Sequence, residues 1–234
     1  MSRLNYILTA GAAIAAMLGT SAADSRQPNI ILMMADDLGY GDVGFNGNEI
    51  IKTPHLDRMA KDGVKLTHFY SGNSVCSPTR GTCLTGRHHH RYGIWTANVG
   101  HLPKQEITLA RMLKEQGYVT GHFGKWHLGT NPTGFDYWEI LPGQGNYYNP
   151  DLIQMDGSRK RYQGYCTDLI TDLALDWMKE QKDAGEPFML MCQHKAPHRN
   201  WSPHPRHFGR YKMGTVPEPD SLFDDYSGRS KLLK

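Results

Sequence analysis

Several features that would place a protein in a specialised class are missing from this 234-residue sequence. Four cysteines are too few for a scaffold held together by disulfides. The sequence contains no internal repeat, no low-complexity segment and no concentrated run of like charges. Because the formal net charge is only +3, nothing in the composition indicates binding to nucleic acid. The length is sufficient for one substantial hydrophobic core or two small ones.

Long hydrophobic runs are also missing, and the nearest approach to one lies at the N-terminus. Arg3 precedes an apolar stretch, and Ser21 and Ala23 supply the small residues that a signal peptidase needs. The apolar stretch is too short and too rich in Ala and Gly for a membrane span, so we expect no stable membrane anchor. We predict a signal peptide over 1–23 and an exported domain over 24–234, in the periplasm or outside the cell. An uncleaved N-terminal anchor is the alternative.

Apolar segments with the periods of strands and helices alternate along the chain. Continuous apolar runs such as 29–35 are typical of strands buried on both faces of a parallel sheet. The expected strands are 29–35, 64–70, 118–123 and 187–193, and the expected helices are 54–62, 76–85, 108–116 and 167–182. Residues 131–160, rich in Gly, Pro, Asn and Tyr, are expected to form a long surface excursion. The alternation predicts an α/β fold with a largely parallel sheet.

One stretch, Cys76-Ser-Pro-Thr-Arg80-Gly-Thr-Cys-Leu-Thr-Gly86-Arg87, combines helix signals with reactive side chains. Pro78 suits the first turn of a helix, and Gly86 is suited to end it. Cys76 would then lie at the helix N-terminus, where unpaired N–H groups favour an anion. Arg80, about one turn further on, can hold an anionic oxygen through its planar fork. A buried cysteine followed by an ordinary capped helix is the simpler alternative.

Polar residues follow two of the expected strands. Asp36 and Asp37 come directly after 29–35, and ligands collect beyond the carboxyl ends of strands in open α/β sheets. Such carboxylates would select Ca²⁺ or Mg²⁺, although a simple polar turn is the alternative. Lys125 and His127 follow the strand 118–123 and share one face if the extended geometry continues. Together they are suited to hold an anion and a proton.

Further histidines lie in two segments. The stretch His194-Lys-Ala-Pro-His198-Arg-Asn-Trp201 follows the last expected strand, and we interpret His194 as a loop residue. The run 88–90 invites a metal hypothesis, but it follows the end of a helix, and a solvated basic turn is the better interpretation.

These motifs, in their order, resemble the type I, formylglycine-dependent sulfatases. The resemblance is carried by the Cys76–Arg87 signature, the Asp36-Asp37 pair, Gly-Lys-Trp-His-Leu-Gly and Ala-Pro-His. The segment 194–201 looks like bacterial glycan sulfatases of the N-acetylglucosamine-6-sulfatase kind. The resemblance implies an alkaline-phosphatase-like α/β/α sandwich with a largely parallel central sheet. It covers only the N-terminal part of the family, so we expect a C-terminally incomplete catalytic domain.

The resemblance also implies a set of cofactors. Cys76 would be oxidised to Cα-formylglycine by a formylglycine-generating or an anaerobic sulfatase-maturating enzyme. Asp36, Asp37 and the modified residue 76 would hold Ca²⁺, in preference to Mg²⁺. Once Cys76 is converted, three cysteines remain, so at most one disulfide can form within the chain.

The remaining catalytic roles follow from the same resemblance. Arg80 and Lys125 would steady the formylglycine and the developing charge. His127 would handle the proton of the hydrate, and His198 would assist the departing alcohol. Lys125 and His198 would also contact the sulfate.

The expected activity is therefore sulfuric ester hydrolysis that removes sulfate from a sulfated carbohydrate during glycan degradation. One alternative is a phosphate- or phosphonate-ester hydrolase of the same superfamily. Another is a truncated remnant that does not turn over substrate, because 201–234 contains no Asp-Asn or Asp-Gln pair of the kind that completes the family's calcium site. The activity of the isolated chain is accordingly in doubt.

Overall fold

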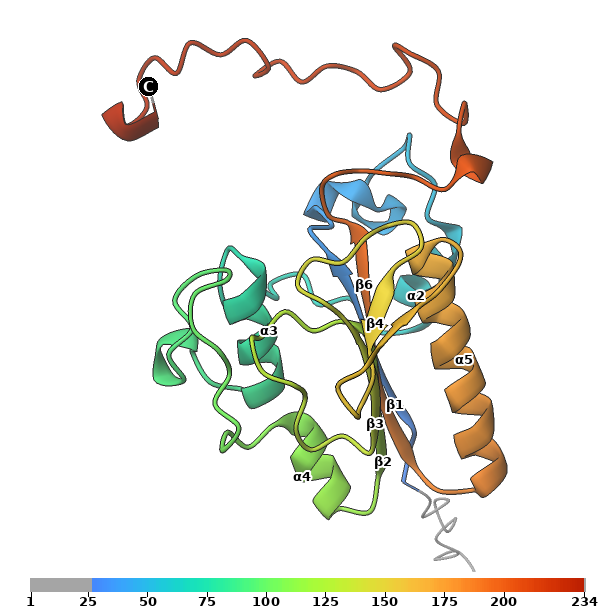
Figure 1. The fold of residues 1–234 in the computed structure, drawn as a ribbon. Coiled ribbons are helices and arrows are strands. Elements are labelled where there is room, and N and C mark those ends of the chain that lie inside the picture. The colour runs from blue at the N-terminus through green and yellow to red at the C-terminus, as the bar shows by residue number, and fades with distance from the viewer. Residues whose placement is uncertain (1–26, 234) are drawn as a thin grey trace, which may run out of the picture.

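The computed structural model describes residues 27–233, so the expected signal peptide lies outside the described residues. A six-stranded sheet with the order β1-β6-β2-β3-β4-β5 forms the centre (Figure 1). The first four of these strands run parallel, and β4 and β5 are added antiparallel at one edge. The strands are β1 Ile30–Asp36, β2 Val119–Lys125, β3 Tyr137–Leu141, β4 Asp151–Ile153, β5 Arg159–Arg161 and β6 Phe188–Pro197.

Helices cover both faces of this sheet (Figure 1). The α-helices are α2 Pro54–Asp62, α3 Cys76–Thr85, α4 Leu109–Glu115 and α5 Cys166–Ala184. Short 3₁₀ turns are η1 Tyr40–Asp42, η2 Gly44–Asn46, η3 His89–Arg91, η4 Pro205–His207 and η5 Lys231–Leu233. No helix in the described part of the chain is long and apolar enough to cross a membrane. The expected α/β fold with a largely parallel sheet is confirmed.

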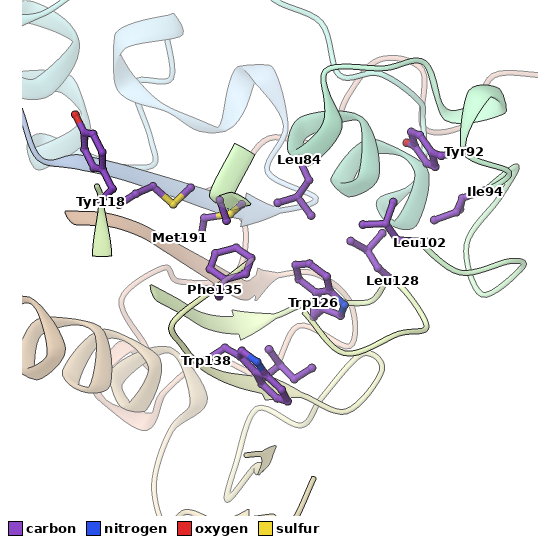
Figure 2. Close-up of a cluster of buried hydrophobic side chains, with 13 residues drawn as sticks. Leu84, Tyr92, Ile94, Leu102, Tyr118, Trp126, Leu128, Phe135, Trp138 and Met191 are labelled. Carbon is purple, nitrogen blue, oxygen red and sulfur yellow. The ribbon is translucent and has the colours of Figure 1, made fainter. Parts of the chain in front are cut away.

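The two faces of β6 belong to two separate cores, because successive side chains of a strand point to opposite faces. Met189 and Met191 pack with α3, α4 and the aromatic side chains Trp126, Phe135 and Trp138 (Figure 2). Phe188, Leu190 and Cys192 pack on the other face against Ile170, Ala174 and Trp177 of α5. The continuous apolar run of β6 therefore reflects burial on both sides.

The prediction of burial on both faces is wrong for β1. Its side chains alternate, and Ile31 and Met33 are 45% and 55% exposed. Within the described chain β1 lies at the edge of the sheet and pairs only with β6. One face and one edge of this strand are therefore open.

Two other expectations are also wrong. Residues 64–70 form no strand, and Val64, Leu66 and Phe69 are exposed, because no strand of the sheet lies beside them. The segment 131–160 is not only a surface excursion, since it contributes β3, β4 and β5 to the sheet. Its glycines and prolines mark turns that separate short strands. Because turn residues dominate the segment, the short buried strand β3 was not predicted from the sequence.

Candidate active site

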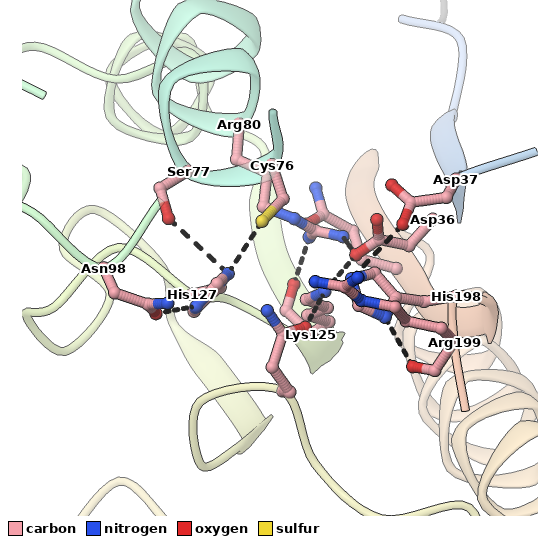
Figure 3. A network of polar contacts seen from close by, with 12 residues as sticks. Asp36, Asp37, Cys76, Ser77, Arg80, Asn98, Lys125, His127, His198 and Arg199 are labelled. Atoms are coloured by element: carbon pink, nitrogen blue, oxygen red, sulfur yellow. Dashed lines mark hydrogen bonds and ion pairs between the residues drawn. The ribbon is translucent and has the colours of Figure 1, made fainter. Parts of the chain in front are cut away.

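The polar side chains of the motifs meet at one end of the sheet (Figure 3). Asp36 ends β1, Lys125 ends β2, and His198 follows directly after β6. Because these three strands are parallel neighbours, their carboxyl ends lie together. Cys76 comes from a different kind of element, since it is the first residue of α3. Its helix ends at Gly86 in the left-handed conformation (φ 64°), as the sequence predicts.

A buried ion cluster joins three of these elements. Asp36, Arg80 and Lys125 are only 5%, 2% and 0% exposed. Asp36 Oδ2 accepts a hydrogen bond from Arg80 Nη2 at 3.0 Å and also pairs with the Lys125 ammonium. Arg80 Nη1 donates to the carbonyl oxygen of Lys125 at 2.5 Å and to the side-chain oxygen of Gln193. The charges thus compensate one another out of contact with water.

Asp36 remains ionised in this cluster. Burial favours its protonated form, but the hydrogen bond from Lys125 and the charges of Arg80 and Lys125 outweigh burial. They hold the pKa of the Asp36 carboxyl below its usual value of 3.8. Asp36, Arg80 and Lys125 together therefore carry one net positive charge. The second carboxylate oxygen of Asp36 is not engaged by Arg80 or Lys125.

A second group of side chains is suited to a divalent cation. Asp36, Asp37 and His198 bring ligand atoms within 4.8 Å of one another, and they are the only such group within residues 27–233. His198 Nε2 lies 3.2 Å from Asp37 Oδ2, and the Asp37 side chain is 58% exposed. Carboxylate oxygens are the ligands that Ca²⁺ and Mg²⁺ prefer. The described histidines at 88–90 form no comparable group, and two of the three are exposed, in agreement with a solvated basic turn.

Cys76 contacts the imidazole of His127. The sulfur lies 3.1 Å from His127 Nδ1, and the hydroxyl of Ser77 lies 3.5 Å from the same nitrogen. His127 Nε2 lies 2.5 Å from Oδ1 of Asn98 (Figure 3). Burial and the nearby charges of Lys125 and Arg80 lower the pKa of His127 to about 4, so the ring is neutral near pH 7.

The expected strand geometry does not continue through Lys125 and His127. β2 ends at Lys125, and His127 adopts a left-handed conformation with φ 55°. This turn, rather than the alternation of a strand, directs both side chains into the site. Lys125 and His127 therefore lie in the same site, but for a different geometric reason than the one predicted.

Four further residues of the site lie outside the motif roles assigned from the sequence. Gln193 reaches Arg80, and the side-chain oxygen of Gln144 accepts from the Lys125 ammonium at 2.5 Å. Lys195 is 5% exposed, with Nζ 4.7 Å from the ring centroid of Tyr147. Burial, followed by the charge of Lys125, lowers the pKa of Lys195. Gln193 and Lys195 could have been found from their place in β6 before His198, whereas Gln144 and Asn98 lie in loops and give no signal.

His194 is a strand residue of β6, and the prediction of a loop is wrong. Its Nε2 lies 3.5 Å from the sulfur of Cys192, which packs on the α5 side of the sheet. The strand continues to Pro197, so His194 and His198 are separated by the end of β6. All four cysteines are free thiols.

The arrangement is chemically suited to nucleophilic attack on an anionic substrate. Residue 76 is partly exposed at a helix N-terminus, a neutral imidazole lies beside it, and buried cations lie behind it. Carboxylates that can hold a cation complete the site on the opposite side.

Known proteins are similar to this chain in sequence and in fold. A family model described as Sulfatase matches residues 28–227. The chain is 40% identical over 228 residues to the N-acetylglucosamine-6-O-sulfatase of Bacteroides thetaiotaomicron, in an alignment covering 96% of this chain and 40% of that protein. It is 36% identical over 224 residues to the N-acetylgalactosamine-6-sulfatase of Canis lupus familiaris, covering 79% and 42%. The chain thus spans well under half the length of these relatives.

Solved structures also resemble this chain. The structure of a protein in complex with its substrate D-glucosamine-2-N,6-O-disulfate is similar with a TM-score of 0.83 and 42% identity. That match covers 88% of this chain and 42% of the other. The structure of Ps i-CgsB in complex with k-i-k-neocarrahexaose matches with a TM-score of 0.74 and 30% identity, covering 81% and 50%.

Proposed function

Because this chain belongs to the sulfatase family, we propose that its site hydrolyses sulfate esters of a sulfated carbohydrate. The observation that carries the proposal is the contact between Cys76 and His127 in front of the buried cations Arg80 and Lys125. The fold is alkaline-phosphatase-like, as the motifs implied. Both solved neighbours named above are complexes with carbohydrates, which supports a carbohydrate substrate.

We propose that Cys76 is converted to Cα-formylglycine by a formylglycine-generating or an anaerobic sulfatase-maturating enzyme. The hydrate of this aldehyde would supply one hydroxyl to attack sulfur and a second whose deprotonation releases the sulfate. The surroundings of residue 76 fit such a group. Its side chain lies at the N-terminus of α3, is partly exposed, and meets a nitrogen that can accept a proton.

The carboxylates on the side of residue 76 away from His127 fit a calcium ion in part. Asp36 and Asp37, which lie with His198 in one group of possible ligands, would hold it together with the modified residue 76. The ion would supply positive charge for the sulfate oxygens. Calcium takes roughly six to eight oxygen ligands, so these groups provide an incomplete shell. Mg²⁺ is the less favoured ion.

The chain's own side chains then have distinct roles. His127 Nδ1 accepts a proton from the hydroxyl at residue 76. Lys125 and Arg80 place fixed positive charge behind the reacting centre. His198 stands beside Asp37, where its ring can donate a proton to the departing alcohol. Lys125 and His198 would both contact the sulfate.

The test of this function is release of sulfate from N-acetylglucosamine 6-sulfate by protein whose Cys76 has been converted, as checked by peptide mass spectrometry. We expect slow release that a calcium chelator abolishes and that the variant Cys76→Ala lacks. Faster release of phosphate than of sulfate from matched esters would favour a phosphoesterase. Converted protein that releases neither would show a remnant without turnover.

We also propose that the protein is exported after cleavage of the residues 1–23, which lie outside the described part. Ser21 and Ala23 suit the −3 and −1 positions of a cleavage site, so the mature chain is expected to begin close to Asp24. N-terminal sequencing of the secreted protein checks this prediction. A secreted form that still begins at Met1 or Ser2 would contradict it.

A further inference from the structure

We infer that Asn98 is a positioning residue that holds His127 with its proton on Nε2, so that Nδ1 faces residue 76 with its lone pair. The inference rests on the proposed function, because it concerns the base that acts on residue 76. Asn98 belongs to none of the motifs of the sequence. It lies in the loop between η3 and α4, far along the chain from both Cys76 and His127.

The chemistry of the neighbouring atoms assigns the proton. A neutral imidazole has one N–H, and the hydrogen bond at one nitrogen decides what the other can do. The neighbour of Nε2 is the amide oxygen of Asn98, at 2.5 Å, and such an oxygen can only accept. The neighbours of Nδ1 are the thiol of Cys76 and the hydroxyl of Ser77, which both carry a hydrogen. Nε2 is therefore the donor and Nδ1 the acceptor.

The backbone of the loop prepares Asn98 for this contact. Its φ is 61°, in the left-handed region that asparagine tolerates better than most residues. Its side chain and those of Ser77 and His127 line a common cavity of about 320 Å³. Water in that cavity can either donate to Nε2 or accept from it, so water in place of Asn98 would not fix the tautomer. The amide oxygen does fix it.

Loss of Asn98 should act only through His127. The Asn98 side chain contacts the ring of His127 and makes no hydrogen bond to Cys76, Arg80 or Lys125, and its amide lies on the side of the ring away from residue 76 (Figure 3). Without it, the ring can populate the tautomer with the proton on Nδ1. In that tautomer Nδ1, the nitrogen that faces residue 76, has no free lone pair and cannot accept a proton.

The first experiment reads the tautomer directly. Full-chain protein with unmodified Cys76 is labelled with ¹⁵N-histidine, and the signals of His127 are identified by their loss in His127→Gln. We expect the two ring nitrogens of His127 to show the Nε2–H tautomer. Asn98→Gly, which keeps the left-handed backbone accessible, should give mixed tautomers, and Asn98→Asp, which keeps an acceptor, should retain the pattern.

A matched control is available in Asn149. It is also an exposed asparagine with positive φ (47°), but its amide oxygen accepts from the backbone of Gly164. Asn149→Gly should leave the His127 signals unchanged. An Nδ1–H tautomer in the unaltered protein, or unchanged His127 signals in folded Asn98→Gly, would overturn the inference.

The second experiment is kinetic and uses protein with converted Cys76. Asn98→Gly should lower kcat for sulfate release roughly 10- to 100-fold with little change in KM, as for other groups that orient a histidine. Asn98→Asp should recover most of the rate, and Asn149→Gly should match the unaltered protein. A raised KM with unchanged kcat would contradict a positioning role. If the unaltered protein releases no sulfate, the proposed function fails. The tautomer measurement still tests the position of the His127 proton, because it does not depend on turnover.

Discussion

At the scale of single residues, Asp36, Arg80 and Lys125 form a buried ion cluster, so replacing one of them changes the contacts of the other two. We expect Arg80→Met to lower the free energy of unfolding by about 1–3 kcal/mol, because Asp36 keeps its pair with Lys125 while the buried side-chain oxygen of Gln193 loses its donor. Urea denaturation provides the measurement. The control is Arg161→Met, which breaks an exposed pair with Asp151 and should change little. Equal effects of the two substitutions would contradict the importance of burial.

His122 should make the protein sensitive to acid. Both ring nitrogens are buried without a hydrogen-bond partner, and burial together with the charge of Arg80 lowers the pKa of His122 from 6.5 to about 3. Between these pH values the unfolded chain binds a proton that the folded chain does not. The free energy of unfolding should therefore fall, as the pH falls, by about 1.4 kcal/mol per pH unit from this residue alone.

The variant His122→Phe tests that contribution. The ring of His122 lies edge-on to those of Trp126 and Phe135, so an aromatic replacement suits the site. Chemical denaturation at a series of pH values between about 6.5 and 3 should show a flatter dependence in the variant. Parallel curves for the two proteins would show that His122 does not titrate in this way.

The sequence predicted which motif residues meet at the site better than it predicted the residues that support them. Cys76, Arg80, Lys125, His127 and His198 stand in motifs, and the structure brings all of them to one end of the sheet. The supports depend on contacts between distant segments. Asn98 and Gln144 reach the site from loops, and no local pattern indicates which loop residue will face a given side chain.

At the scale of elements, the pairing of β2 with β6 depends on Gly124. This residue has φ 101°, and a Cβ there would collide with the carbonyl oxygen of Gln193 in β6. Gly124→Ala should lower the free energy of unfolding by about 3 kcal/mol, from backbone strain and steric overlap together. It should also displace Lys125, the next residue, from Asp36.

The matched control is Gly86→Ala at the end of α3. Gly86 also has positive φ (64°), but an added Cβ would meet no atom within 4 Å. Its replacement should cost only the strain of a left-handed alanine, about 1 kcal/mol. Urea denaturation of both variants checks the difference, and similar losses would argue against a special role for the β2–β6 contact.

The existence and type of elements with a long, uninterrupted pattern were predicted correctly, whereas short elements were missed. β6 and α5 are buried on sides that their apolar periodicity indicates. β3 has five residues between turn signals, too few for a period to be recognised. The segment 64–70 has the alternation of a strand, but a strand also needs a neighbour, which a local pattern does not supply.

At the scale of the whole molecule, the open face and edge of β1 should promote self-association. Ile31 and Met33 expose apolar side chains beside an unpaired strand edge within the described chain. Met33→Lys should reduce concentration-dependent association measured by sedimentation velocity. The control is Met213→Lys, because Met213 is fully exposed in the segment after β6 and belongs to no strand. A monomer at every concentration without any substitution would contradict the prediction.

The position of β6 in the sheet also bears on the timing of biosynthesis. Of the strands in residues 27–233, β6 is the last to be made, yet it lies between β1 and β2 and pairs with both. Until it emerges, the first and second strands have no common neighbour and α3 has no completed sheet to pack on. Roughly 120 residues separate Cys76 from the end of β6, which at about 5–20 residues per second corresponds to roughly 6–24 seconds of translation. During that interval Cys76 belongs to a chain whose sheet is still incomplete, which would leave time for the proposed conversion to formylglycine.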